Sequence, residues 1–253
     1  MERLPSMLDI LIADLQRRYG ARAARRGSAL PSPASLPALA TGCPTLDAAL
    51  PQGGAPRGRL TVIGGPRSAG VNTLAFGLIA RAQAIGELAC ILDLQHTFAP
   101  AAAAVQGVNL ADLALARPAD GPAAALTVAT LLVRRAVGVL VIDHLATWLA
   151  LPRGAPALRT LLPRLPRLLA ASGCALVVTE PAPTGLLSEP PPPPRALLVP
   201  LTSLRLTLAL QSWVWHGPRI VGSRTRVTVL APPFATPLAT VTVDLPIAAL
   251  EDQ

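Results

Sequence analysis

The segment that most constrains the fold is a short apolar strand that leads through a glycine turn directly into a helix. Residues 60–63 form the strand, Gly65 and Gly70 mark the turn with the spacing G-x-x-x-x-G, and residues 72–84 have the length and composition of a helix. This order of strand, glycine turn and helix is the context in which a phosphate-binding loop occurs. It predicts an α/β domain built on a parallel sheet.

The middle of the chain continues the alternation of strands and helices. Three further apolar runs are predicted as buried strands, at residues 89–94, 137–142 and 175–179. Helices are predicted at residues 123–135 and 158–171, and Pro163 and Pro166 are expected to kink the second helix. Continuous apolar strands separated by helices indicate a mostly parallel sheet with helices on both faces.

The last part of the chain follows another pattern. Residues 203–210, 224–230 and 239–244 are predicted as strands, and no helical segment separates them. Strands that follow one another without helices pair antiparallel, so we expect an antiparallel C-terminal extension of the parallel sheet. Between the two halves, residues 181–198 contain five consecutive prolines, which predict an extended surface loop.

The N-terminal residues predict a separate arm. Residues 7–19 place apolar side chains on one face of an amphipathic helix. A run of basic residues overlaps the end of this helix and continues beyond it: Arg17, Arg18, Arg22, Arg25 and Arg26. The run is either a solvated helix end or an arm that contacts phosphates or a neighbouring protein, and both interpretations stay open. A linker rich in proline, alanine and serine follows, so we expect an arm at residues 1–38 and a core at residues 39–253.

Arginine supplies all 22 basic residues of the chain, and lysine is absent. The absence of lysine excludes a Schiff base, a Ser-Lys pair and the phosphate-binding lysine of a P-loop. The net charge of +8 favours an acidic partner, which is either nucleic acid or an acidic protein.

Cysteine and histidine residues give no sign of a metal or redox site. Cys43, Cys90 and Cys174 are far apart, and the three histidines are scattered as well, so we expect buried thiols in a reducing compartment and no bound metal. The N-terminus lacks the apolar run of a signal peptide, and the longest uncharged stretch, residues 27–46, contains prolines and glycines that exclude a membrane helix. We therefore expect a soluble, cytoplasmic, nucleoid-associated protein with no membrane partner.

Two positions of the glycine loop depart from a phosphate-binding loop. Val71 stands where a lysine reaches the β- and γ-phosphates, and Asn72 stands where a Ser or Thr hydroxyl binds Mg²⁺. Longer segments nevertheless follow one another in a recognisable order: ATGCPTLDAAL, GGAPRGRLTVIGGP, ILDLQHTFAP, VGVLVIDHLA, SGCALVVTE and VGSRTRVTVLAPPFATPLATV. From Leu39 onward these segments resemble the RecA family of strand-exchange recombinases, and LQRRYGARAARR is similar to the end of that family's polymerisation helix. From this resemblance we expect the separate C-terminal domain of that family to be missing.

The resemblance implies a RecA-like core that hydrolyses ATP to form a filament on DNA. The catalytic glutamate of the family falls at Gln95, an amide that cannot accept a proton from water. Other family positions have lost their chemistry: the two adenine-contacting residues fall at Ala99 and Ala102, the γ-phosphate sensor at Glu180, and two lysines that act across the filament interface at Ala231 and Pro233. The retained positions are Gly65, Ser68, Gly70, Thr73 and Asp143, the last being the Walker B carboxylate.

These departures remove charge, base recognition and proton transfer together. Because phosphoryl transfer depends on electrostatic positioning, we expect no ATPase activity, no catalytic residue and no resident cofactor. The nucleotide-binding site is then vestigial, and it comprises Gly65, Arg67, Ser68, Gly70, Asn72, Thr73 and Asp143. In the alternative interpretation, Arg67 replaces the lysine charge and the chain still binds ATP and Mg²⁺.

The resemblance also implies two DNA-binding loops. The first follows Trp148 and is shortened to residues 150–156. The second is the proline-rich loop at residues 181–198, which offers Arg195 and no aromatic side chain for base stacking. This composition favours partner docking or plain spacing over base stacking.

Three hypotheses for the function follow. The first is a RecA-like paralogue with an inactivated ATPase site, a non-catalytic accessory in DNA repair or recombination that binds DNA, preferably single-stranded, or a DNA-repair protein through the arginine arm and Arg195. Accessory proteins of SOS-response translesion synthesis, the ImuA type, look similar because they combine this core with degenerate nucleotide motifs. The second hypothesis is a divergent ATP-binding, DNA-dependent recombinase. The third is a self-assembling structural protein or a modulator of RecA filaments.

Overall fold

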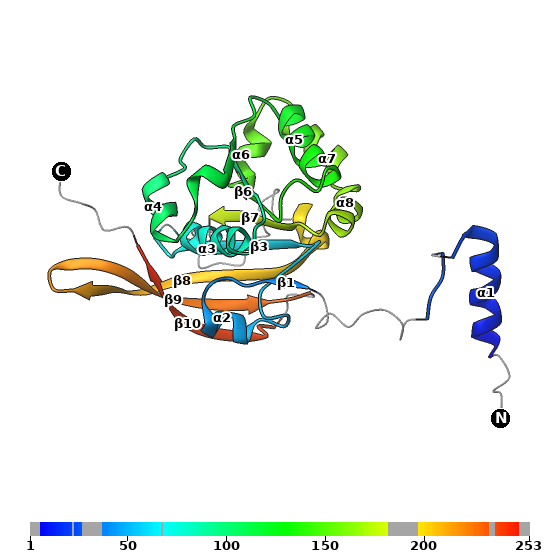
Figure 1. The fold of residues 1–253 in the computed structure, drawn as a ribbon, viewed down its shortest axis with the longest axis horizontal. Coiled ribbons are helices and arrows are strands. Elements are labelled where there is room, and N and C mark those ends of the chain that lie inside the picture. The colour runs from blue at the N-terminus through cyan, green and yellow to red at the C-terminus, as the bar shows by residue number, and fades with distance from the viewer. Residues whose placement is uncertain are drawn as a thin grey trace. The chain divides into compact units, whose positions relative to one another are not determined.

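The computed structural model describes residues 6–21, 23–26, 37–66, 68–181, 197–232 and 236–247. The chain forms two compact units, Met1–Leu36 and Pro37–Gln253, whereas the sequence predicts their boundary at residues 38 and 39. The first unit holds helix α1 (Met7–Tyr19), which has the bounds predicted from its apolar spacing (Figure 1). This helix begins at a capping box, in which the Ser6 hydroxyl accepts from the Asp9 N–H and the Asp9 carboxylate accepts from the Ser6 N–H.

The second unit is built on an eight-stranded sheet with the order β10-β9-β8-β3-β7-β6-β4-β5 (Figure 1). The strands are β3 (Leu60–Gly65), β4 (Ala89–Asp93), β5 (Leu113–Ala116), β6 (Val139–Asp143), β7 (Ala175–Pro181), β8 (Thr202–His216), β9 (Arg219–Leu230) and β10 (Ala239–Pro246). The six strands from β8 to β5 pair parallel, and β9 and β10 continue the sheet antiparallel. This topology confirms the predicted α/β fold with an antiparallel C-terminal extension. A two-stranded sheet is formed by β1 (Ala38–Leu39) and β2 (Ala55–Pro56).

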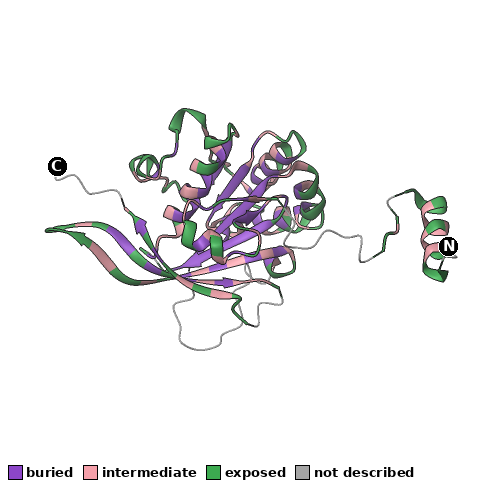
Figure 2. Ribbon diagram, turned by 60° about the horizontal axis from the view of Figure 1, so that its bottom comes forward, coloured by how far each residue is buried: buried purple, intermediate pink, exposed green. Residues whose placement is uncertain are grey.

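Helices cover both faces of the large sheet. They are α2 (Pro44–Ala49), α3 (Val71–Ala84), α4 (Pro100–Val105), α5 (Gly121–Val133), α6 (Leu145–Ala150), α7 (Gly154–Leu161) and α8 (Leu165–Ser172), with 3-10 turns at Leu110–Asp112 and Val199–Leu201. One apolar cluster joins α2 and α3 to one face of the strands, and a second cluster joins α5 to α8 to the other face. Alternate residues of the central strands enter the two clusters, so these strands are buried on both sides (Figure 2).

The main difference from the sequence prediction lies at residues 158–171. The expected single kinked helix is broken into α7 and α8, and the break contains Pro163. Proline has no N–H to donate and its ring clashes with the preceding turn, so the chain ends one helix and begins another. The short elements α2, α4, α6 and β5 are absent from the sequence prediction, because four to six residues carry little periodic signal. Within the described part of the chain, no helix has the length and apolar character needed to cross a membrane.

Candidate functional site

The glycine loop has the local geometry that its sequence predicts. Strand β3 ends at Gly65, the Ala69 N–H donates to the Pro66 carbonyl at 3.1 Å, and α3 begins at Val71. Gly70 has a φ of +88°, a left-handed conformation that glycine adopts at little cost. Ser68 also has a positive φ of +67°. The loop therefore keeps the sharp turn of a phosphate-binding loop. Arg67, which the alternative interpretation needs, lies outside the described residues.

Apolar side chains occupy the space beside this loop. A Cβ atom added at Gly70 would lie 2.3 Å from Cδ1 of Leu245, a β10 residue that is 2% exposed. A Cβ added at Gly65 would lie 3.1 Å from Cγ2 of Val71. Leu245 belongs to the buried apolar cluster under α3, and half-buried Val71 packs against this cluster. The position that carries a lysine in a P-loop therefore holds an apolar side chain in contact with the hydrophobic core.

Asp143 lies at the end of β6 and accepts hydrogen bonds from three neighbouring side chains. The Thr179 hydroxyl donates at 2.7 Å, His144 Nδ1 lies 2.8 Å from the same oxygen, and the Thr97 hydroxyl is 3.4 Å from the other one. Burial raises the pKa of Asp143, but the hydrogen bonds from His144, Thr179 and Thr97 together bring the pKa below its usual value. The carboxylate is therefore held ionised by side chains of this chain.

A second buried carboxylate lies beside Asp143 in the sheet. Asp93 ends β4 in register with Asp143, and it accepts from the Thr97 N–H at 2.9 Å and from the Arg117 guanidinium at 2.8 Å.

Gln95, which the resemblance places at the family's catalytic position, is exposed and donates to the Thr147 hydroxyl at 3.0 Å. Among the described residues, no group of three or more His, Cys, Asp or Glu side chains could hold a metal ion.

Glu180, at the family's sensor position, forms a buried ion pair. The Arg205 guanidinium on β8 donates to the Glu180 carboxylate on β7 at 2.7 Å, and the two side chains are 13% and 8% exposed. Strand β3 lies between β7 and β8, with Gly64 in register with Glu180. The negative charge at this position is therefore offset within the protein.

The remaining predicted positions are spread over several elements. Asn72 is exposed in the first turn of α3, and Thr73 is half-buried beside it. Ala99 precedes α4, Ala102 lies within it, and Ala231 follows β9. Arg22, Arg195 and Pro233 lie outside the described residues, as does most of the proline-rich loop.

The arginine arm is partly engaged by its own carboxylates. Arg26 donates to Asp9 at 2.6 Å and to the Ser6 hydroxyl at 2.9 Å, and Arg18 pairs with Asp14 at 3.0 Å. The hydrogen bond from Arg26, together with those from Ser6, lowers the pKa of Asp9 to about 2. No ion pair of Arg17 or Arg25 is found among the described residues, so the guanidinium groups of these two arginines are available to contact another molecule.

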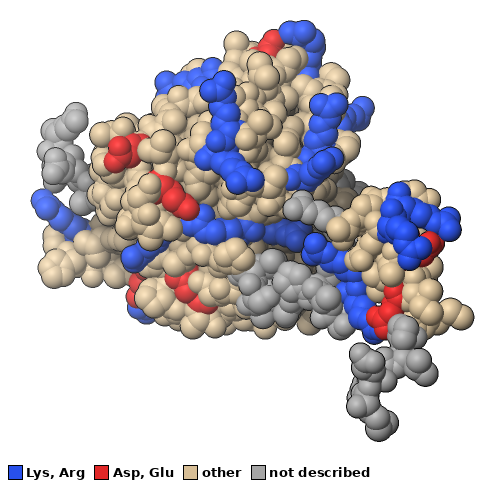
Figure 3. Space-filling view, turned by 45° about the vertical axis from the view of Figure 1, so that its right-hand side comes forward, with Lys and Arg blue, Asp and Glu red and all other residues tan. Residues whose placement is uncertain are grey.

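The core unit also has a strongly basic surface. The segment from residue 145 to residue 179 contains no Asp or Glu, and its arginines are Arg153, Arg159, Arg164 and Arg167. All four are exposed, and of these only Arg153 has an ion pair within the described part of the chain, with Asp120 at 2.6 Å. Figure 3 shows basic side chains gathered over the upper part of the core unit, where α5 to α8 lie.

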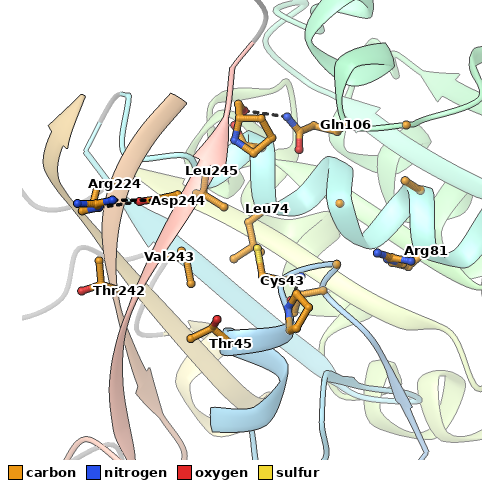
Figure 4. A pocket seen from close by; sticks show the side chains of 18 of the residues that line it. Cys43, Thr45, Leu74, Arg81, Gln106, Arg224, Thr242, Val243, Asp244 and Leu245 are labelled. Carbon is orange, nitrogen blue, oxygen red and sulfur yellow. Dashed lines mark hydrogen bonds and ion pairs between the residues drawn. The ribbon is translucent and has the colours of Figure 1, made fainter. Parts of the chain in front are cut away.

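Sequence reasoning missed a pocket of about 780 Å³ between α3, α2 and β10 (Figure 4). Its walls include Cys43, Leu74, Arg81, Gln106 and Asp244. Two contacts close one side, because Gln106 donates to the Pro246 carbonyl at 2.8 Å and Arg224 pairs with Asp244 at 2.8 Å (Figure 4). The lining comes from segments far apart in the chain, so no local sequence signal could have revealed the pocket.

Comparisons with known proteins agree with this fold. A family model described as the RecA N-terminal domain matches residues 6–153. The RecA protein of Symbiobacterium thermophilum is 30% identical over 250 residues, which cover 90% of this chain and 71% of that protein. The RecA protein of Chlorobaculum tepidum is 31% identical over 253 residues, covering 90% and 72%. The match to RecA of Chlorobium limicola is 39% identical over 142 residues, and it spans only 40% of that protein's length.

Proposed function

The chain belongs to the RecA family, and on this premise we propose that it is a non-catalytic accessory protein of DNA recombination or repair, which binds DNA without turning over ATP. The packing of Leu245 and Val71 against the glycine loop is the observation that carries the proposal. Buried Leu245 and half-buried Val71 are apolar, so they cannot solvate or neutralise a triphosphate.

The other positions of the site support the same proposal. Gln95 is an amide that donates to Thr147, and an amide cannot act as a general base toward water. The Glu180 carboxylate is engaged by Arg205, so the position of a phosphate sensor serves an internal ion pair. Each lost donor of this kind costs about 3–4 kcal/mol of transition-state stabilisation, and several are lost together.

The charge distribution supports DNA as the partner. The chain has a net charge of +8, and exposed arginines with no ion pair among the described residues lie on α7 and α8 and, as Arg17 and Arg25, in the N-terminal arm. Arginine binds phosphate through two parallel hydrogen bonds. Single-stranded DNA is the preferred form in this proposal, and a DNA-repair protein is the alternative partner.

Two titrations of the purified chain test the proposal, one with ATP and Mg²⁺ and one with a single-stranded oligonucleotide, each at two salt concentrations. We expect no ATP binding and no hydrolysis, together with DNA binding whose log–log salt dependence has a slope of about −0.7 per phosphate contact. The variant carrying both Val71→Lys and Asn72→Thr is the matched control, and it is expected to stay inactive because Leu245 and Gln95 are unchanged. Micromolar ATP binding by the wild-type chain would overturn the proposal and support the divergent recombinase.

A second candidate function, self-assembly, is favoured by helix α1. Met7, Ile10 and Leu11 are 84%, 55% and 54% exposed, and no residue of α1 is buried among the described residues. An amphipathic helix gains most of its stability by packing its apolar face, so a second copy or a related filament subunit would provide that surface. Deleting residues 1–26 and measuring the mass in solution tests this candidate, which requires the full chain to be larger than a monomer and the deleted chain to be monomeric.

A further inference from the structure

The long hairpin of β8 and β9 ends in a tip that the site described above does not use. Its two strands have 15 and 12 residues, and the hairpin extends beyond the other strands of the sheet (Figure 1). Three cross-strand pairs define the tip: Trp213 with Ser223, Trp215 with Ile220, and His216 with Arg219. The turn between them is Gly217 and Pro218, and Gly217 has the positive φ of +59° that a two-residue hairpin turn requires.

Two of the three tryptophans of the chain lie at this tip. Trp215 is 58% exposed and Trp213 is half-buried, whereas the third, Trp148, is 0% exposed in the core. Trp213 and Trp215 are two residues apart on β8, and the pairing with β9 shifts its register between Val214 and Trp215, so both tryptophans lie next to an irregularity of the hairpin. Core packing does not explain a tryptophan that leaves more than half of its surface in water.

The hairpin itself carries basic residues and no carboxylate, and the nearest described carboxylate, Asp244 on β10, is paired with Arg224. No Asp or Glu occurs between residues 197 and 232. Arg205 and Arg224 of the hairpin pair with Glu180 and Asp244. Arg219 at the tip is exposed and has no ion pair among the residues that the structure describes.

We infer that the hairpin tip is a stacking site for the bases of a single-stranded nucleic acid, with Trp215 and Trp213 contacting the bases and Arg219 contacting a backbone phosphate. This inference rests on the proposed DNA-binding function and names one of its contacts. Residues two apart in a strand are about 6.8 Å apart, and bases are spaced about 3.4 Å along a nucleic acid strand, so both rings are close enough to reach bases of one strand. Exposed aromatic rings next to unpaired arginine are the combination that binds single strands without sequence preference. The absence of carboxylates from residues 197–232 favours a polyanion over a protein of mixed charge.

Tryptophan fluorescence reports directly on this contact. The full-length chain is titrated at low salt with an oligothymidylate and with an abasic oligonucleotide of the same length and charge, and buried Trp148 supplies the unquenched background. We expect oligothymidylate to quench the emission and the abasic strand to bind about a hundredfold more weakly, because it lacks both stacked bases. Trp215→Leu removes one of the two stacking contacts, so it is expected to weaken oligothymidylate binding about tenfold and to leave the binding of the abasic strand unaffected. Leu238→Ala, at another exposed apolar position, is the control variant and should bind like the wild type.

The outcomes separate this inference from the proposed function. If DNA binds with equal affinity to wild type and Trp215→Leu, without quenching, the stacking site is wrong and the accessory function stands on the arginines alone. If Trp215→Leu weakens the two strands equally, the tip acts through charge or folding and stacking is again wrong. Should no oligonucleotide bind the wild-type chain at low salt, both the inference and the proposed DNA binding fail, and the tip is then a protein contact.

Discussion

The contact between Leu245 and the glycine loop predicts that two substitutions are strongly coupled. Gly70→Ala would put a Cβ atom 2.3 Å from Leu245 Cδ1 at a φ of +88°. Overpacking of a core costs about 1–3 kcal/mol, and the left-handed conformation costs a residue with a Cβ about 1–2 kcal/mol. We therefore expect Gly70→Ala to lower the free energy of unfolding by about 2–5 kcal/mol.

Leu245→Ala removes the side chain that the new Cβ would meet. Alone, this substitution is expected to cost about 2–5 kcal/mol, because it leaves a cavity in a core position that is 2% exposed. In the double variant the overpacking disappears, since the alanine at position 70 grows into the space that Leu245 leaves. The double variant should therefore be more stable than the sum of the two single effects predicts, by about 1–3 kcal/mol.

Urea denaturation followed by circular dichroism measures all four members of this cycle. Gly53→Ala is the matched control, because Gly53 has a similar φ of +73° and nothing within 4 Å of the added Cβ. Gly53→Ala should lower the free energy of unfolding only through the left-handed backbone conformation, by about 1–2 kcal/mol. Equal costs at Gly70 and Gly53, together with additive effects in the double variant, would refute the packing of Leu245 on the loop and the steric part of the proposed function.

Two further predictions concern carboxylates with lowered pKa values. Arg26→Gln should raise the pKa of Asp9 from about 2 toward its usual value of 3.8, and an NMR titration measures this change. The native ion pair of Arg26 and Asp9 stabilises the arm above pH 3.8, and this stabilisation is lost as the pH falls toward 2. Thr179→Val should raise the pKa of Asp143, because it removes the hydrogen bond from the Thr179 hydroxyl. It should also lower the free energy of unfolding by about 1–3 kcal/mol at neutral pH. Because the native pKa of Asp143 is lowered, the loss of stability caused by Thr179→Val should shrink as the pH falls through the range in which carboxyl groups are protonated. A loss of stability that does not depend on pH would contradict the hydrogen bond from Thr179 to the ionised Asp143.

The parts of the fold that the sequence predicts well are those with a local signal. The buried strands β3, β4, β6 and β7 are continuous apolar runs, and the helix after Gly70 follows from the glycine spacing. The helix ends near Pro163, whereas the sequence predicts only a kink there. A second proline, Pro166, fits the first turn of a new helix, so the chain begins α8 instead of continuing α7.

The features that the sequence does not predict depend on the order of strands in the sheet. Leu245 reaches Gly70 because β10 folds back beside β9, and Arg205 reaches Glu180 because β8 and β7 flank the same strand. Neither contact has a local pattern, since the partners are distant along the chain. The sequence shows Val71 where a phosphate-binding loop has a lysine, but the contacts that Val71 makes become visible only in three dimensions.

On the proposed function, the former nucleotide contacts have been exchanged for contacts within the chain. Val71 and Leu245 pack beside the loop, Arg205 neutralises Glu180, and Thr179 and His144 contact Asp143. In a nucleotide-binding protein, groups of this kind are satisfied only when the ligand is bound, which couples folding stability to the ligand. Here the described groups are satisfied without one. The carboxyl edge of the sheet should therefore be rigid in the absence of ATP, so DNA or protein binding at the hairpin and the arginine surfaces needs no nucleotide to prepare it.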